Sequence, residues 1–261
     1  MAGSGKLPLA FAAVAKKKGD DVIAIGLKGV TDSSLTEAVC KIHWLDWGTL
    51  NKVFILLVTE RIRKVVMLGK IDKSSLFKNR ESLDDKAREL FKKIDGKRDY
   101  SVLKGVSDLF GKLGVEVVDP TTYLESLIPQ KGLLTKRGPS EKEWEDIRYG
   151  LEIAKALSGF DIGQTVVVKD RTIIALESVE GTDETISRAG RLVDGGFSVV
   201  KVARPNQDMR FDVPLVGVDT VKTLLSSGGR VIALEEKKTF LVDREEIVRL
   251  ADENGISVVI V

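Results

Sequence analysis

Strand-length apolar segments alternate with helical segments along the first half of the chain, and this alternation limits its fold more than any other feature. The apolar segments lie at 21–26, 39–45, 64–69 and 115–118. Between them apolar residues recur every three or four positions, which is the period of a helix with one buried face. Strands and helices in this order form βαβ units around a parallel sheet. The sequence therefore predicts an α/β fold whose N-terminal part is Rossmann-like.

The second half of the chain has a different order of strands and helices. Residues 165–169 and 172–176 are rich in β-branched side chains and are separated by Asp170 and Arg171, which predicts a hairpin. Further strands are expected at 197–203, 230–234 and 256–261, and helices at about 183–193, 218–225 and 243–254. The second half is therefore predicted to be a mixed α/β domain.

A segment rich in proline, glycine and basic residues separates the two halves. Residues 129–140 read PQKGLLTKRGPS, and Ser140 with Glu143 makes a capping box that opens a helix. We therefore place a Rossmann-like N-terminal domain at 1–130, a linker at 131–138 and a mixed α/β C-terminal catalytic domain at 139–261.

Charge balance and the scarcity of cysteine and histidine limit the chemistry of the chain. The 41 basic and 39 acidic residues leave a net charge of +2, which gives no case for a nucleic-acid partner. Cys40 is the single cysteine, so an intramolecular disulfide is impossible and a reducing compartment fits. Its apolar neighbours predict that Cys40 is buried. His43 is the single histidine, so acid–base and metal chemistry is expected to fall to carboxylates.

The N-terminal residues AGSGKLP place Gly3 and Gly5 in a tight turn ahead of a helix that runs to about residue 18. The N–H groups of such a turn can bind phosphate. A G-x-G pattern alone is common, and the strand before it is expected to be very short. The full dinucleotide fingerprint is missing, so NAD is not predicted.

Residues 201–217, KVARPNQDMRFDVPLVG, combine cations that suit phosphate with carboxylates that suit a divalent metal. Asp208 and Asp212 are four positions apart and would share a face in a helix or in a strand. Both carboxylates could then converge on one ion, with Lys201 and Arg210 facing phosphate. A solvated loop whose charges pair with each other explains the same pattern, and the pattern alone leaves both interpretations open.

Two further polar clusters lie at predicted edges of strands or helices. Residues 161–164, DIGQ, suit a binding site or a simple turn into the hairpin. Residues 180–183, EGTD, place two carboxylates at the start of a helix, where Thr182 or Asp183 could equally serve only as the N-cap.

Taken together, these motifs resemble the UDP-2,3-diacylglucosamine pyrophosphatases of the LpxI type. The resemblance runs from AGSGKLP through GLLT at 132–135 to the specific segments 161–168, 177–183 and 201–217. It implies a two-domain hydrolase of lipid A biosynthesis that cleaves UDP-2,3-diacylglucosamine to UMP and 2,3-diacylglucosamine 1-phosphate. A non-catalytic nucleotide-sugar or lipid-binding protein is the alternative, although a pure binder would not need paired carboxylates beside its phosphate-binding cations.

The same resemblance implies roles for individual residues. Asp208 and Asp212 would bind Mg²⁺ and orient water, with the essential one of the two left open. Lys201 and Arg210 would hold the diphosphate. The remaining substrate-binding candidates are Gly3, Gly5, Gln164, Glu180, Thr182, Asp183 and Gln207. A homodimer in the cytoplasm is expected, and peripheral contact with the inner membrane is an open alternative because the substrate is a lipid.

Overall fold

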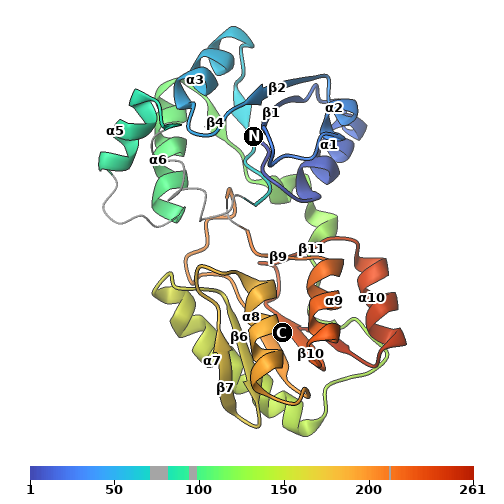
Figure 1. Cartoon of the computed structure of the whole chain (residues 1–261). Helices are drawn as coiled ribbons and strands as arrows, with labels where there is room; N and C mark the ends of the chain where they lie inside the picture. The colour runs from blue at the N-terminus through green and yellow to red at the C-terminus, as the bar shows by residue number, and fades with distance from the viewer. Residues whose placement is uncertain (71–81, 94–98, 212) are drawn as a thin grey trace. The chain divides into compact units, whose positions relative to one another are not determined.

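The computed structural model describes residues 1–70, 82–93, 99–211 and 213–261, and contacts divide the chain into two compact units (Figure 1). The first unit holds Met1–Glu125 together with Asp208–Asp212, and the second holds Ser126–Gln207 and Val213–Val261. The chain therefore leaves the second unit for one short segment of the first and then returns. The predicted linker 131–138 lies within the second unit.

The first unit contains two pairs of parallel strands. Strand β1 (Ile23–Leu27) pairs with β2 (Lys41–Leu45), and β3 (Lys64–Val65) pairs with β4 (Glu116–Val117). The helices of this unit are α1 (Leu7–Lys17), α2 (Leu35–Ala38), α3 (Leu50–Thr59), α5 (Asp85–Lys93) and α6 (Asp99–Lys112). Strands and helices alternate as the sequence predicts.

The first residues of the chain join the two strand pairs. The Ala2 N–H donates to the Ile25 carbonyl at 2.9 Å, and the Gly3 N–H donates to the Leu68 carbonyl at 2.7 Å. The resulting order, β2, β1, N-terminal residues, β3, β4, is the order of a Rossmann-like sheet. The predicted very short first strand is therefore central to the sheet, and the Rossmann-like prediction is confirmed.

Cys40 lies just before β2, the outer strand of this order, and it is exposed. The prediction that Cys40 is buried is wrong. Apolar neighbours indicate burial only where a strand has a covering layer, and the Sγ atom instead lies 3.5 Å from Oδ1 of the exposed Asp21.

Phe211 belongs to the core of the first unit, although it lies more than 80 positions beyond the rest of that unit in the sequence. Its side chain is 1% exposed and packs in a cluster with Leu45, Phe54, Phe110 and Val117. One aromatic side chain therefore anchors the returning segment, which also carries Asp208.

The second unit is built on a six-stranded sheet in the order β5, β12, β10, β8, β6, β7. The strands are β5 (Gly132–Leu133), β6 (Thr165–Lys169), β7 (Thr172–Leu176), β8 (Ser198–Lys201), β10 (Val231–Leu234) and β12 (Ser257–Ile260). Strands β8, β10 and β12 are parallel, whereas β5, β6 and β7 pair in antiparallel fashion. The predicted hairpin and the mixed α/β architecture are confirmed.

Helices cover both faces of this sheet (Figure 1). They are α7 (Glu141–Gly159), α8 (Thr182–Leu192), α9 (Val218–Ser226) and α10 (Arg244–Glu253), and a parallel pair of β9 (Leu215–Val216) and β11 (Phe240–Leu241) lies beside them. Alternate strand residues face opposite layers: Val200 packs in the cluster of α7, and Val199 packs in that of α8, α9 and α10. The predicted capping box of α7 is present, with both of its hydrogen bonds.

The edge at which β8 ends is also the edge at which β6 begins, because these strands are antiparallel. Lys201 at the end of β8 is paired in register with Thr165 at the start of β6. Ligands of α/β proteins usually bind outside the carboxyl ends of parallel strands. We therefore expect a functional site of the second unit at this edge.

Over the described ranges, no helix has both the length and the apolar character of a membrane span.

The anchoring role of Phe211 predicts that Phe211→Ala lowers the free energy of unfolding of the first unit by about 3–5 kcal/mol, because the substitution opens a cavity in a packed core. Urea unfolding would be followed by tryptophan fluorescence in a Trp144→Phe background, in which Trp44 and Trp47 of the first unit remain. The exposed Ile55 of α3 supplies the control Ile55→Ala, for which we expect a change below about 0.5 kcal/mol. Equal effects of the two substitutions would contradict the anchor.

Candidate active site

A buried ammonium group is the centre of a polar cluster at this sheet edge. Lys201 is 6% exposed, and its Nζ donates to Thr182 Oγ1 at 2.5 Å and to Thr165 Oγ1 at 3.4 Å. Thr182 is the first residue of α8, and Thr165 is the first residue of β6. The ends of three elements therefore meet at one positive charge, which is the kind of group that binds phosphate.

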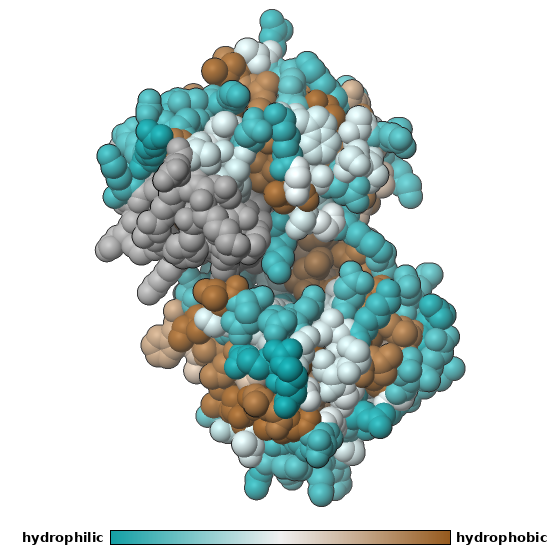
Figure 2. All heavy atoms as spheres, viewed as in Figure 1, coloured by the Kyte–Doolittle hydropathy of each residue, from teal (hydrophilic) through white to brown (hydrophobic). Residues whose placement is uncertain are grey.

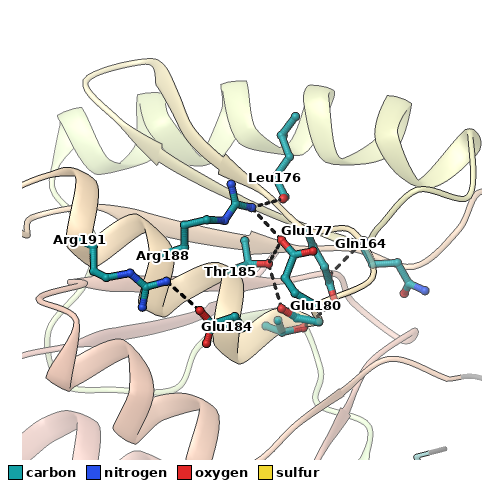
Figure 3. A network of polar contacts seen from close by, with 10 residues as sticks. Gln164, Leu176, Glu177, Glu180, Glu184, Thr185, Arg188 and Arg191 are labelled. Atoms are coloured by element: carbon teal, nitrogen blue, oxygen red, sulfur yellow. Dashed lines mark hydrogen bonds and ion pairs between the residues drawn. The ribbon is translucent and has the colours of Figure 1, made fainter. Parts of the chain in front are cut away.

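Glu177, which follows β7, brings a carboxylate to the same cluster. Its Oε1 accepts from the Thr182 hydroxyl at 3.2 Å. Its Oε2 accepts from the Gln164 N–H, also at 3.2 Å (Figure 3). Burial raises the pKa of Glu177, but the charge of Lys201 and hydrogen bonds from Thr165, Gln164 and Thr182 outweigh it and hold the pKa below its usual value. Glu177 is therefore the ionised partner that offsets the burial of Lys201.

Glu177 is absent from the residues singled out by sequence reasoning, although it opens the motif ESVEGTD. The signal that could have found it is its position immediately after a β-branched strand, three residues before Glu180. At that position its side chain reaches the start of both β6 and α8.

Gln164 presents a second polar group beside Glu177. Its backbone N–H is used by Glu177, while its side chain points away from that carboxylate (Figure 3). The side-chain Oε1 is buried and has no hydrogen-bond partner among the described residues. Buried polar atoms in proteins are usually paired. An acceptor in this condition suits a ligand that donates a hydrogen bond, such as a hydroxyl or an amide.

The two carboxylates at the start of α8 have protein partners of their own. Glu180 Oε1 accepts from Arg188 Nη2 at 2.8 Å and from Thr185 Oγ1 at 3.3 Å (Figure 3). Asp183 Oδ1 accepts from Thr220 Oγ1 at 2.8 Å. The N-cap position is Gly181 with φ of +85°, so neither Thr182 nor Asp183 is the cap of this helix. Of the EGTD residues, Thr182 is the one in contact with Lys201.

In the first unit, Asp208 and Arg210 form a two-pronged ion pair. Arg210 Nε lies 2.9 Å from Asp208 Oδ1, and Arg210 Nη2 lies 2.6 Å from Oδ2. These side-chain hydrogen bonds lower the pKa of Asp208, and a bond from the Arg210 N–H and the charges of Arg210 and Lys104 lower it further. Burial raises the pKa, but by less, so the pKa stays below its usual value. Asp208 is therefore a fixed, ionised carboxylate, and the pairing of charges that the sequence left open is present here.

The segment that carries this pair is a turn rather than a helix or a strand. The shared-face argument for Asp208 and Asp212 therefore does not apply, because it assumes a regular element. Asp212 lies outside the described residues. Gln207, whose N–H donates to the Arg204 carbonyl at 3.1 Å, is the last residue of the second unit before the turn.

Among the residues that the structure describes, no three side chains of histidine, cysteine, aspartate or glutamate gather as a metal site. Mg²⁺ does not need such a cage, because it is commonly held by one or two carboxylates together with substrate phosphates and water. Asp208 and Asp212 supply carboxylates of the kind this ion prefers, so the donor chemistry fits Mg²⁺.

Different structural constraints favour glycine at the two positions of the N-terminal turn, Gly3 and Gly5. A Cβ on Gly3 would lie 2.6 Å from the Lys70 carbonyl oxygen, so packing within the sheet explains this residue. Gly5 has φ of +91°, and no described atom lies within 4 Å of the place its Cβ would take. Gly5, not Gly3, therefore has open space beside it at the start of α1.

Two family models and one curated protein match this chain. The model described as the LpxI N-terminal domain matches residues 1–127, and the model described as the LpxI C-terminal domain matches residues 130–259. UDP-2,3-diacylglucosamine pyrophosphatase LpxI from Caulobacter vibrioides (strain ATCC 19089 / CIP 103742 / CB 15) is 28% identical over 269 residues. The alignment covers 99% of this chain and 95% of that protein.

The lowered pKa of Glu177 predicts how the stability of the second unit depends on pH. A carboxyl group with a lower pKa in the folded state stabilises the fold above its unfolded pKa of about 4.3, and the contribution disappears as pH falls through the folded value. Glu177→Gln should therefore be less stable than the wild type at pH 7, and the difference should shrink progressively below about pH 4.

Urea unfolding between pH 7 and pH 3, followed by circular dichroism, would measure this difference. Glu184→Gln is the control, because Glu184 lies on α8, the helix that begins shortly after Glu177, and forms an exposed ion pair with Arg191. A loss of stability in Glu177→Gln that is constant over this pH range would show that the electrostatic interaction of Glu177 with Lys201 is not its source.

Proposed function

The chain belongs to the LpxI family, and on that premise we propose that it hydrolyses the diphosphate of UDP-2,3-diacylglucosamine. The products are UMP and 2,3-diacylglucosamine 1-phosphate, and the reaction is a step of lipid A biosynthesis. The observation that carries the proposal is that both halves of the chain match LpxI domains, over 1–127 and 130–259. The cluster around Lys201 supports it, because a diphosphate needs a positive group in a partly desolvated site.

In this proposal Lys201 binds the diphosphate and offsets the charge that develops as a phosphorus–oxygen bond breaks. Thr165 and Thr182 hold its Nζ in place, and Glu177 balances its charge before substrate arrives. A pre-positioned ammonium does not have to reorganise during the reaction, which is the usual source of electrostatic catalysis. Gln164 and Thr182 provide polar contacts beside it.

The bond-breaking step is attack of water on one phosphorus of the diphosphate. The water oxygen forms a bond to that phosphorus, and the bond from the phosphorus to the bridging oxygen breaks. The other phosphate leaves with the bridging oxygen, and the proton of the water passes to the solvent. We assign orientation of this water to Asp208 and Asp212, and diphosphate binding to Arg210 as well as Lys201. The carboxylate of Asp208 is suited to orienting water because Arg210 holds both of its oxygens in a fixed position.

We also propose that Asp208 and Asp212 hold Mg²⁺, which when bound would polarise the phosphate oxygens. The remaining substrate-binding assignments are Gly3, Gly5, Glu180, Asp183 and Gln207. We further propose that the protein is a cytoplasmic homodimer. Light scattering after size-exclusion chromatography measures the last property directly.

A nucleotide-sugar or lipid-binding protein without activity is the alternative. Incubation with UDP-2,3-diacylglucosamine and Mg²⁺, followed by chromatography for UMP, separates the two functions. Release of UMP that is abolished by a chelator and restored by added Mg²⁺ is the expected result. Binding of the substrate without UMP would support the alternative.

The assignment of Asp208 and Asp212 predicts that at least one of Asp208→Asn and Asp212→Asn lowers kcat by about 10²-fold or more, since each removes a charged group from the reacting centre. Initial rates of UMP release at saturating substrate would measure the loss. Asp219→Asn, at an exposed position on α9, should retain the wild-type rate. Wild-type rates in both site variants would contradict the assignment.

The assignment of Lys201 predicts that Lys201→Met lowers kcat/KM by about 10²-fold or more, because the diphosphate loses a pre-positioned cation. Lys169 provides a matched control, since it lies on the adjacent strand β6 at the end opposite Thr165. Lys169→Met should stay within about twofold of the wild type. Comparable losses in the two variants would remove the special role of Lys201.

A further inference from the structure

Three large apolar side chains are exposed on two neighbouring loops of the second unit. Phe160 and Ile162 follow α7 and are 73% and 47% exposed, and Val179 follows β7 and is 71% exposed. The face of this unit on which α7, β6 and β7 lie in Figure 1 also carries other hydrophobic residues (Figure 2). Single exposed apolar residues are ordinary, but a group of them on adjacent loops is typical of an interaction surface.

The two loops are held together beside the candidate active site. A Cβ on Gly163 would lie 2.1 Å from the Glu177 carbonyl oxygen, so only glycine permits this approach. The Gln164 N–H also donates to the Glu177 carboxylate. The backbone that presents the apolar side chains is therefore the same backbone that positions Gln164 and Glu177.

The carboxylates of these loops all have cationic partners. Asp161 accepts from Arg204 at 2.5 Å and Glu180 from Arg188 at 2.8 Å, while Glu177 interacts electrostatically with Lys201. Three negative and three positive groups balance, so the ionised side chains of the loops leave no net charge to repel anionic lipid headgroups. The apolar side chains can then enter a lipid surface without the repulsion that unpaired carboxylates would cause.

We propose that the loops 160–164 and 177–181 form a lipid-docking surface, in which Phe160, Ile162 and Val179 insert into the headgroup region of a phospholipid bilayer. The inference rests on the proposed function, because a substrate with two acyl chains would be taken from a bilayer. Docking through these loops would bring Glu177 and Lys201 to the level of the headgroups, where the diphosphate of such a substrate lies.

Vesicle flotation of the full chain tests this surface without any substrate. The probe is vesicles of phosphatidylcholine and phosphatidylglycerol, and the variant is the triple substitution Phe160→Ser, Ile162→Ser and Val179→Ser. We expect its partition coefficient to fall by about tenfold or more, and wild-type binding to persist at high salt because the contact is apolar. Ile55→Ser with Val58→Ser, on exposed positions of α3, should bind like the wild type.

Several outcomes would overturn the proposal. Wild-type protein that does not float with vesicles, or a triple variant that floats equally well, would exclude the docking surface. A triple variant that changes from dimer to monomer in light scattering would show that the patch is a subunit interface instead.

Activity assays separate a docking surface from a site for the acyl chains of the substrate. The triple variant should lose about tenfold in kcat/KM toward substrate in vesicles but keep wild-type activity toward a water-soluble short-chain analogue. An equal loss on both substrates would assign the loops to acyl-chain binding and overturn the proposal. If wild-type protein releases no UMP from either substrate, the proposed function fails, while the flotation result still decides on the surface.

Discussion

The burial of a single ammonium group organises the site of the second unit. An uncompensated charge inside a protein is strongly unfavourable, so Lys201 has to be met by oxygen atoms from several directions. The hydroxyl oxygens of Thr165 and Thr182 accept hydrogen bonds from its Nζ, and the charge of Glu177 balances it from a distance. These three residues lie at the ends of β6, α8 and β7. The requirement to solvate one charge internally therefore fixes where three elements begin or end.

Periodicity and cap chemistry were sufficient to predict most elements, because they depend on neighbouring residues. The hairpin at 165–176 and the capping box of Ser140 and Glu143 are local in this sense. Burial of Cys40 was predicted wrongly because exposure depends on the place of β2 at the outside of a sheet. The very short first strand is predicted correctly, but its length does not reveal that it lies between β1 and β3.

The candidate site was predictable in its residue types and less so in its pairing. Charge pattern singles out Lys201, Asp208 and Arg210, and their roles toward phosphate and metal stay predictions. The partners of Lys201 depend on tertiary contacts, because its charge interacts with Glu177, which the pattern does not select. Arg210 is bonded locally, to Asp208 in the same turn. A regular period also cannot describe residues 208–211, because a turn has none.

The position of Phe211 has a consequence for how the protein is made. The core of the first unit includes a residue that leaves the ribosome only after most of the second unit has been synthesised. At usual rates of about 5–20 residues per second, the first unit waits several seconds for its last core side chain. A fragment that ends at Glu125 would lack that side chain permanently. The two units are therefore not independent in biogenesis, because the core of the first is completed only after a large part of the second has been synthesised.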